Sequence, residues 1–429
     1  MTQEVAATAP PMRRLGFASV AGTALEYYDF AAYNTLAALV FNKLFFPTFD
    51  ATAGTLLSFA TFWVGYLSRP VGGVLFGHLG DRRGRRFVLM VTLLLMGVST
   101  VLIGLLPTYA QIGAWAPALL VSLRFIQGVA LGGEWAGAVL LSLEHGAEGQ
   151  RGRNASFAQM GPSVGTVMAF AVVALTQGWL TDEQQISWGW RVPLLASIVL
   201  VAFGIWLRAG VTETPQFLEL ERRSALARAP LGLVLREHGR GLLVSAGARL
   251  GPDVMYSCYA VFSISYVTQT LGLPRSLPVG LLAIGAVLNA ACMPLAGQLS
   301  DRYGRRAVYG AGVLAALLCM AAFFPLLDSR EVPAMLLALC AASVVHAFMY
   351  GPQAAFIAEQ FPAQVRYAGA SLAYTLGGIF AGGIAPLVLA ALYREFGSSR
   401  PLTLYVAAAL AITGLVLAIS ARRVAGVPR

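Results

Sequence analysis

Twelve long apolar runs dominate this sequence, and they leave few folds open to it. Each run can cross about 30 Å of hydrocarbon as a helix rising 1.5 Å per residue. The chain of 429 residues is 57% hydrophobic and only 12% charged, against about 25% charged residues in globular proteins. A soluble helical core is therefore a poor alternative, and helices are expected because lipid leaves the backbone no other hydrogen-bond partner. The expected spans are Phe17–Phe41, Ala53–Leu79, Phe87–Leu106, Ala116–Leu143, Ala155–Leu175, Trp190–Leu207, Leu242–Gln269, Leu277–Leu299, Ala307–Leu326, Pro333–Ala358, Tyr367–Leu392 and Leu402–Ala421.

Loop charges predict the orientation. With the N-terminus inside, 21 basic residues, Arg208 among them, fall in inner segments and six in outer segments. Cytoplasmic loops carry this excess of Lys and Arg, so both termini are expected in the cytoplasm. The net charge of +10 comes with no zinc, helix-turn-helix or RNA-binding signature. Lipid headgroups and topology explain it better than nucleic acid does.

One polar sequence occurs twice, as GHLGDRRGRR at 77–86 and GQLSDRYGRR at 297–306. A shift of 220 residues aligns these loops, and a shift of 215 aligns Glu144 with Glu359 and Arg151 with Arg366. We expect an N-terminal six-helix bundle over 1–208, a cytoplasmic linker over 209–241 and a C-terminal six-helix bundle over 242–429. Two related bundles around a midplane site are a transporter arrangement.

These motifs also carry a family resemblance. GHLGDRRGRR resembles the loop between spans two and three of the major facilitator superfamily, and LVSLRFIQG at 120–128 resembles its fourth-helix motif. ALEYYDFAAY, GYLSRPVGGVLFG, RFIQGVALGGEWAGA and WGWRVPLL are similar to the metabolite:proton symporter family. One departure is that Thr375 follows Tyr374, where that family often has asparagine.

The resemblance implies an all-α integral membrane fold of twelve helices in two pseudo-symmetric bundles. It implies a bacterial inner-membrane carrier that takes up organic acids, or zwitterions such as proline and betaine, with protons. The proton gradient supplies the energy, so no cofactor or metal is expected, and we expect a monomer.

Two acids lie near the middle of the first span. Glu26 and Asp29 are three residues apart and share a helix face with Tyr33, a candidate for lining the substrate site. Two nearby carboxylates in a low dielectric cannot both ionise cheaply, so at least one is a candidate proton carrier. The alternative is a structural ion pair or a water-facing acid without a coupling role.

Span four carries Arg124, with Gln127 one turn later and Glu134 beyond. Arginine offers a fork of donors that suits a carboxylate, so Arg124 is a candidate for substrate binding or proton coupling. A salt bridge that only locks helices is the alternative. Glu134 is a candidate for the same pathway or for pairing with a neighbouring helix. Arg69 in span two is expected at a helix interface, with substrate access as the lesser possibility.

Span seven carries Arg249 and Asp253, four residues apart and on one face with Tyr256. These charges would suit an anionic substrate moved with protons, whereas an intrahelical pair that eases insertion is the alternative. His346 in span ten can bind substrate, shuttle protons or pack as a satisfied histidine. Further lining candidates on that helix are Tyr350 and Gln353.

The repeated loops predict a cytoplasmic gate. Glycine closes each D-R-x-G-R-R turn while the charged residues reach neighbouring helix ends. We expect Asp81 to pair with Arg153 or Arg366, and Arg85 with Glu144. The repeat extends the gate to Asp301, Arg305, Glu359 and Arg366. The alternative is that these arginines only set topology and contact lipid phosphates.

Other functions fit less well. The phosphate-binding loop G-x-x-x-x-G-K-[ST], hydrolase motifs and metal clusters are absent from the sequence, so we expect no enzyme and no ATP-driven pump. GPSVG at 161–165 faintly resembles the antiporter motif of drug exporters. Proton-coupled uptake of a small organic acid, with protons and membrane lipids as further partners, is the leading hypothesis; zwitterion uptake and drug or metabolite antiport are the alternatives.

Overall fold

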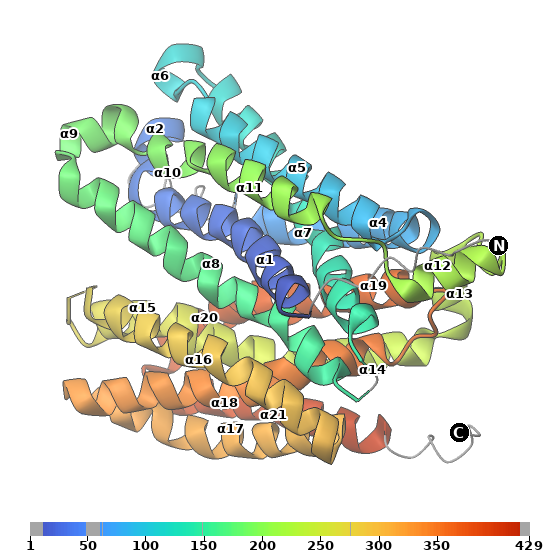
Figure 1. The fold of residues 1–429 in the computed structure, drawn as a ribbon. Helices are drawn as coiled ribbons and strands as arrows, with labels where there is room; N and C mark the ends of the chain where they lie inside the picture. The colour runs from blue at the N-terminus through green and yellow to red at the C-terminus, as the bar shows by residue number, and fades with distance from the viewer. Residues whose placement is uncertain (1–11, 49–60, 62, 148, 275, 421–429) are drawn as a thin grey trace.

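The described part of the chain folds into helices that are arranged in two halves. The computed structural model describes residues 12–48, 61, 63–147, 149–274 and 276–420, and within these ranges it contains no strand. Figure 1 shows the helices from α1 to α11 in one layer and those from α14 to α21 in the other.

The N-terminal half contains six of the expected spans. The first part of the expected span Ala53–Leu79 lies outside the described residues. The elements are α1 (Met12–Leu36), η1 (Ala37–Phe41), α2 (Asn42–Phe45), α4 (Arg69–Arg83), α5 (Arg85–Leu105), α6 (Tyr109–Ile112), α7 (Trp115–His145), α8 (Arg151–Trp179), α9 (Asp182–Gln184), η2 (Gln185–Gly189), α10 (Arg191–Leu195) and α11 (Ser197–Ala209).

The C-terminal half contains the other six. Here the spans expected over 242–269 and 367–392 are each interrupted by π-helical segments, η3, η4 and η5, which loosen the helix locally. The elements are α14 (Gly239–Tyr256), η3 (Ser257–Phe262), α15 (Ser263–Ser265), η4 (Tyr266–Thr270), α16 (Ser276–Tyr303), α17 (Arg305–Asp328), α18 (Val332–Ala358), α19 (Arg366–Gly378), η5 (Ile379–Gly383), α20 (Ala385–Phe396) and α21 (Arg400–Ser420).

The predicted all-helical membrane fold is confirmed. Among the described residues, nine helices are long and apolar enough to cross a membrane. Where the expected spans are described, their ends lie within about five residues of the observed helix ends.

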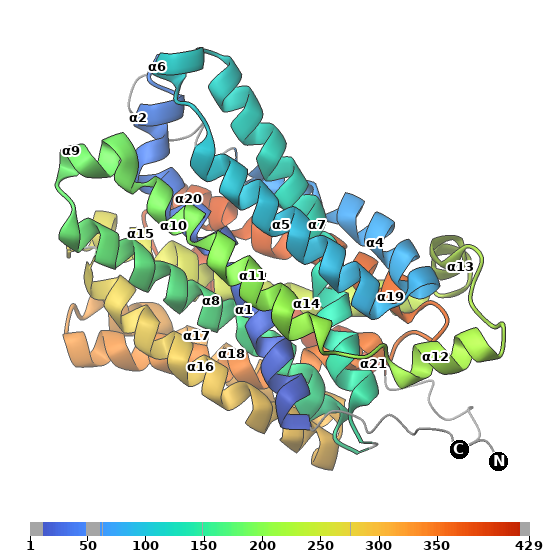
Figure 2. The same ribbon diagram turned by 45° about the horizontal axis from the view of Figure 1, so that its top comes forward.

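The segment between the halves forms two short helices, α12 (Pro215–Arg222) and α13 (Pro230–Glu237). Figure 2 shows both at the end of the bundle where α4 meets α5, opposite α6 and α9. We call this end, which carries the loops at 80–86 and 300–306, the motif end. At the motif end α13 contacts α4 of one half and α14 and α19 of the other.

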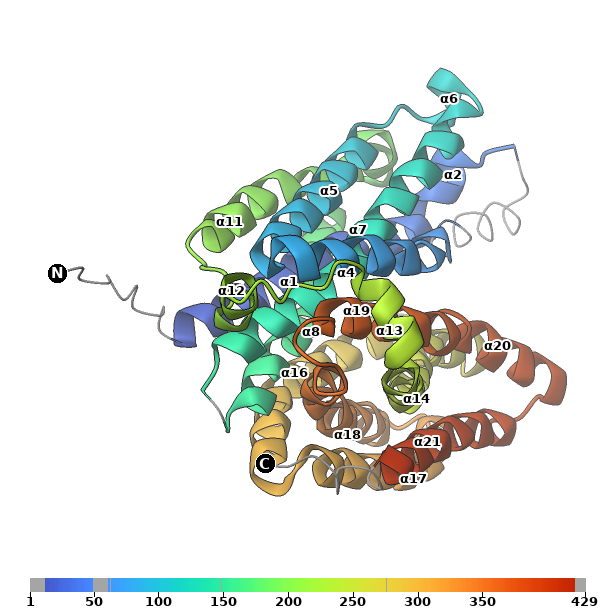
Figure 3. The ribbon, with the colours of Figure 1, turned by 90° about the vertical axis from the view of Figure 1, so that its right-hand side faces the viewer.

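The halves meet chiefly along two helix pairs, α4 with α19 and α8 with α16 (Figure 3), with further contacts of α8 with α18 and of α7 with α19. Small residues allow the close approach. A Cβ on Gly77 would lie 2.9 Å from the Cα of Ala368, and one on Gly297 would lie 2.6 Å from the carbonyl oxygen of Gly152. Gly77 and Gly297 are related by the 220-residue shift, so the sequence repeat is also a repeat of contacts.

Each motif loop turns on a glycine with left-handed backbone. Gly84 has φ 98° and Gly304 has φ 93°, a region that side-chain-bearing residues rarely adopt. Both residues immediately precede a long helix, α5 or α17. The expectation that glycine closes these turns is therefore met at both repeats.

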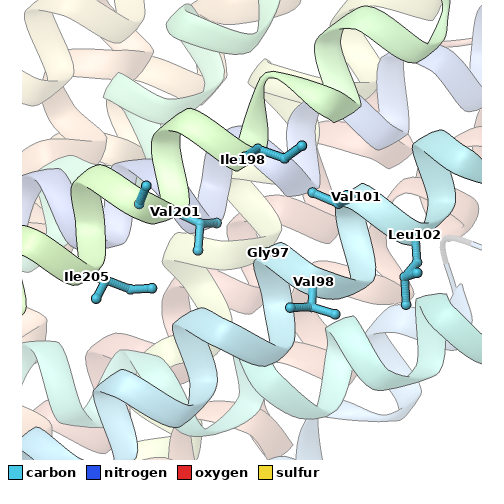
Figure 4. Close-up of a pocket in the computed structure, with 8 residues that line it drawn as sticks. Gly97, Val98, Val101, Leu102, Ile198, Val201 and Ile205 are labelled. Carbon is cyan, nitrogen blue, oxygen red and sulfur yellow. The ribbon is translucent and has the colours of Figure 1, made fainter.

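An apolar groove of about 330 Å³ runs between α5 and α11 (Figure 4). No polar side chain lines it, so it offers nothing to hold a polar substrate, and its exposed valines and isoleucines suit contact with lipid. The lining residues are Gly97, Val98, Val101, Leu102, Ile198, Val201, Ala202 and Ile205.

Candidate functional site

Asp81 joins the two halves at the motif end. Its two carboxylate oxygens accept hydrogen bonds from the backbone N–H groups of Tyr367 (3.1 Å) and Ala368 (2.8 Å), which begin α19. A carboxylate is favoured there because unpaired N–H groups and the helix dipole meet at a helix N-terminus. Burial raises the pKa of Asp81 to about 7, against the opposing effects of a neighbouring arginine and the two N–H donors. The expected pairing with Arg153 or Arg366 is wrong: within the described chain, Asp81 binds the start of the helix instead.

Asp301 repeats this arrangement in the other direction. It accepts hydrogen bonds from the N–H groups of Gly152 (2.8 Å) and Arg153 (2.9 Å), which begin α8. Gly152 and Arg153 are the positions that a 215-residue shift aligns with the two donors to Asp81. Arg153 thus contributes its backbone N–H, and its side chain is exposed.

The expected arginine–glutamate pairs lie beside these two caps. Arg85 Nε is 3.4 Å from Glu144, which also lies 3.4 Å from Arg366 of the other half. Arg305 is 3.2 Å from Glu359 and 2.6 Å from Asp301. The Arg85–Glu144 pair is fully buried, whereas Glu359 is partly exposed.

The linker adds a third cap that the sequence analysis missed. Glu213 accepts hydrogen bonds from the N–H groups of Arg85 and Arg86, both at 3.0 Å, at the start of α5. Three residues later Gln216 accepts a hydrogen bond from Arg366. The acid two residues before the proline that starts α12, in TETP, was the available signal.

Deeper in the N-terminal half, Arg208 lies between two acids. Its guanidinium is 3.3 Å from Glu26 and 3.0 Å from Glu134. By its position in the sequence Arg208 is expected among the inner-segment arginines, but in the structure Arg208 is only 4% exposed. The signal for it was the presence of two intramembrane acids in one half without an assigned cation. Glu26 therefore belongs to a different network from Asp29, although both lie on α1.

Asp29 is surrounded by hydroxyl groups. Ser197 donates a hydrogen bond to one carboxylate oxygen and Thr100 to the other, at 2.9 Å. Within the described residues no basic side chain pairs with this carboxyl. Gln127 donates to Thr100 (2.8 Å) and accepts from Arg124 (3.1 Å), so a continuous chain of hydrogen bonds connects Asp29 to Arg124.

Arg124 is completely buried and held from several sides. Besides Gln127 it donates to the side-chain oxygen of Asn34 at 3.0 Å. Its guanidinium also lies 4.3 Å from the ring centre of Phe30 and 4.0 Å from that of Tyr33. Tyr33 is itself fully buried, so its ring packs against Arg124 and does not face open space.

In the C-terminal half, Arg249 and Asp253 form an intrahelical pair at 2.6 Å. The pair also reaches beyond α14, because Arg249 donates to the carbonyl oxygen of Tyr374 and lies 3.2 Å from the centre of its ring. The opposite face of this tyrosine stacks on Trp135 of the N-terminal half, with ring centres 3.8 Å apart. Tyr374 is thus sandwiched between the halves.

Tyrosine hydroxyls gather at this interface. The Tyr374 hydroxyl lies 3.0 Å from that of Tyr350 and 3.4 Å from that of Tyr27. Gln159, which the sequence analysis missed, accepts from the indole of Trp135 (2.7 Å) and donates to the carbonyl of Tyr350 (3.0 Å). Both halves therefore supply polar groups to one cluster.

His346 stands beside this cluster. Its Nδ1 accepts a hydrogen bond from Asn289 at 3.2 Å, and Ser163 of the other half donates to the same Asn289 at 3.1 Å. Tyr256 packs on His346 with ring centres 5.5 Å apart and is still 40% exposed. Because His346 is only 4% exposed, this mid-span tyrosine borders solvent-accessible space next to buried groups.

Gln353 lies apart from these residues. It donates to the Tyr309 hydroxyl at 2.7 Å and so binds α17 rather than the interface. No group of three or more His, Cys, Asp and Glu side chains suited to a metal occurs in the described part of the chain.

Together these groups can bind a polar molecule between the halves and hold a proton nearby. The cluster of tyrosines offers donors and acceptors from both halves, with buried arginines close to it. The caps at the motif end connect the same halves by contacts that must break if the halves separate there.

Comparison with known proteins gives consistent relatives. The sequence profile of the Major Facilitator Superfamily matches residues 20–386, with a second match over 253–428. The shikimate transporter of Escherichia coli (strain K12) is 40% identical over 94% of this chain and 93% of its own. The proline/betaine transporter of Salmonella typhimurium (strain LT2) is 32% identical over 97% of this chain and 85% of its own. In fold, the chain resembles the proton:xylose symporter XylE, with a TM-score of 0.75 at 16% identity over 95% of this chain and 94% of that one.

Proposed function

The chain belongs to the Major Facilitator Superfamily, and from this membership we propose that it takes up a small organic acid together with protons by alternating access. As a member of that superfamily it is a multi-pass membrane transporter rather than an enzyme. We place it in a bacterial inner membrane with the motif end and both termini in the cytoplasm, where the loop arginines concentrate. The proton gradient supplies the energy, and no cofactor takes part.

Contacts at the motif end support alternating access. Asp81 and Asp301 each bind the start of a helix in the opposite half, and Glu144 reaches Arg366 across the same boundary. Breaking these contacts opens the site toward the cytoplasm. When each contact breaks, water hydrates the exposed groups and offsets part of the free energy that is lost. This suits a gate that must open and close repeatedly.

The environment of Asp29 is the single observation that supports proton coupling. A buried carboxylate normally has a cation beside it, and without one it neutralises instead, because burying an unpaired charge is very costly. The described partners of Asp29 are two hydroxyl groups, which can hydrogen-bond either form. We therefore assign it the transported proton. Glu26 and Glu134 share Arg208, which makes them the weaker candidates.

The hydrogen-bond chain from Asp29 to Arg124 offers a coupling route. When Asp29 gives up its proton, Thr100 and Gln127 must reorient, and Arg124 loses or changes its contact with Gln127. Protonation of Asp29 on α1 is thereby linked to the contacts of Arg124 on α7. This supports a carrier in which proton and substrate move in the same cycle.

A zwitterion is the second candidate substrate, favoured by the similarity to a proline/betaine transporter. Antiport is the remaining alternative. In the structure the glycines of the sequence GPSVG, Gly161 and Gly165, pack α8 against α1 within one half.

Uptake into proteoliposomes tests the proposal. Labelled shikimate, 2-oxoglutarate, citrate, proline and betaine are offered with an inward proton gradient and again with the gradient collapsed. We expect gradient-dependent accumulation of an acid by the wild type. We expect Asp29→Asn to equilibrate that acid without concentrating it, while Asp328→Asn, a matched change at the opposite end, still concentrates it. Accumulation of proline or betaine alone would replace the organic-acid assignment, and release of a preloaded compound in exchange for protons would overturn symport.

A further inference from the structure

Arg69 is a buried arginine that donates to no acceptor in the part of the chain that the structure describes. It begins α4, is 6% exposed, and lies 3.8 Å from the ring centre of Tyr66 and 4.8 Å from that of Phe30. Among the described residues, its Nε and Nη2 atoms find no hydrogen-bond acceptor and no carboxylate pairs with it. The aromatic faces offset part of the cost of burying the cation, but they leave its N–H groups unsatisfied.

The other mid-bundle arginines differ from it. Arg208 binds two carboxylates, Arg249 binds Asp253, and Arg124 donates to two amide oxygens. Arg69 alone of these four donates to no oxygen atom of the described residues.

The two unsatisfied nitrogens form one edge of the guanidinium. In arginine the Nε–H bond and one N–H bond of Nη2 run parallel on the same side of the plane. A carboxylate bridges such an edge with both oxygens, which gives a strong and directional contact. The unused part of Arg69 is therefore a ready fork for one carboxylate.

The position of Arg69 fits a substrate between the halves. Tyr27 and Asp253 each lie within electrostatic range of both Arg69 and Arg249, so the guanidinium of the N-terminal half and the charged pair of the C-terminal half act on the same groups. The nearest ring, Tyr66, also packs beside Gly382 and Gly383 of η5. Separation of the halves at that point frees Tyr66 to uncover the fork.

We propose that Arg69 binds the carboxylate of the transported substrate, and that this subsite accepts one carboxylate group. Arg249 is neutralised by Asp253, and Arg124 is engaged by Asn34 and Gln127, so a second carboxylate finds no unpaired guanidinium. The site thus favours monocarboxylates over di- and tricarboxylates. This deepens the proposed function and rests on its assignment of the interface as the transport site.

Binding to the full-length protein in lipid nanodiscs tests the proposal, with labelled shikimate and glycine betaine as probes. Their carboxamides, in which an uncharged amide replaces the carboxylate, serve as matched analogues and citrate as a tricarboxylate. We expect the wild type to bind at least one monocarboxylate, and to bind it more tightly than its carboxamide and than citrate. Arg69→Gln should weaken binding of that carboxylate roughly 10- to 150-fold, the range expected for hydrogen bonds to a charged group, and change carboxamide binding by less than about threefold.

Two further variants keep the test decisive. Arg69→Lys retains the charge but not the fork, so we expect an intermediate loss of carboxylate binding; it also carries the comparison if the glutamine variant does not fold. Arg394→Gln removes an exposed arginine at the opposite end and should change nothing. Equal losses for acid and carboxamide would show a packing role for Arg69 and overturn the proposal. Unchanged carboxylate binding, tight citrate binding, or a wild type that binds neither monocarboxylate would overturn it as well.

These outcomes are separate from a failure of the proposed function. If betaine binds through Arg69 and no acid of the uptake experiment accumulates, the organic-acid assignment fails and the carboxylate subsite stands. If a carboxylate binds through Arg69 but the proton gradient does not drive its accumulation, symport fails and the subsite again stands.

Discussion

Removing the Asp301 side chain should open the motif end. Asp301→Ala deletes two hydrogen bonds from a carboxylate to backbone N–H groups, at 2.8 and 2.9 Å, and leaves the start of α8 uncapped. Hydrogen bonds to charged groups contribute about 1.5–3 kcal/mol each when buried, and helix caps about 0.5–2 kcal/mol. Because the Asp301 carboxylate is hydrated once the halves separate, which offsets part of the loss, we take about 1–2 kcal/mol for each bond. The closed form should then lose about 2–4 kcal/mol, a shift of roughly 30- to 1,000-fold toward the open form.

Spin labels on the two halves measure this shift. Ala147 lies in the loop before α8 and Tyr303 ends α16, and both are exposed at the motif end. Double electron–electron resonance on labelled cysteines at these positions should give one short distance in the parent chain. Asp301→Ala should add a longer distance, whereas Asp328→Ala, which removes an acid bonded to Tyr266 within one half, should not. An unchanged distance distribution in Asp301→Ala, with or without substrate, would refute the reasoning that this cap holds the halves together.

Two other perturbations give further predictions. Arg208→Gln leaves Glu26 and Glu134 buried without their cation and should lower the free energy of unfolding by about 3–5 kcal/mol. Thermal unfolding checks this, and adding Glu26→Gln and Glu134→Gln should restore most of the loss; no recovery would show that Arg208 acts by packing. The pKa of Asp81 is about 7 in the closed form and near 3.9 once exposed, so closure takes up a proton. Closure should therefore be favoured as the pH at the motif end falls from 8 to 6 and weakened as it rises, and spin-label distances in Asp81→Asn should lose this dependence; an equal pH response in that variant would contradict the assignment.

Much of the fold follows directly from the sequence. The helix positions follow from the lengths of the apolar runs, because lipid forces each long run into a helix. The repeat goes further, since the 220- and 215-residue shifts relate not only loops but contacts: Asp81 with α19 corresponds to Asp301 with α8. What the shifts could not give is the partner of each carboxylate. Every residue except proline has a backbone N–H, so this donor leaves no mark in the sequence, and arginine side chains were expected where helix ends are bound.

The central site was less predictable because small errors in the predicted span ends change which residues are buried there. Arg208 lies at the last turn of α11, where a shift of a few residues separates a loop arginine from a buried one. Ser197 and Thr100, the partners of Asp29, are common in membrane helices and become informative only when three helices are placed around them. In the sequence, Tyr374 stands out only through Thr375, the residue after it. In the structure the Tyr374 ring lies between Arg249 and Trp135 and joins the halves.

In the middle of the bundle, the described buried acids and arginines are equal in number but are not paired one to one. Among the described residues of this region, four acids, Glu26, Asp29, Glu134 and Asp253, stand against the arginines at 69, 124, 208 and 249. Two of the acids share Arg208 and one pairs with Arg249, which leaves Asp29 with hydroxyls and Arg69 with aromatic rings. A proton completes the first of these sites and a carboxylate the second, so the loaded carrier adds one positive and one negative charge to two separate places. The proposed cycle therefore predicts electroneutral symport of a monocarboxylate with one proton. Uptake that generates a membrane potential, measured with a voltage-sensitive dye during acid accumulation, would contradict this pairing of sites.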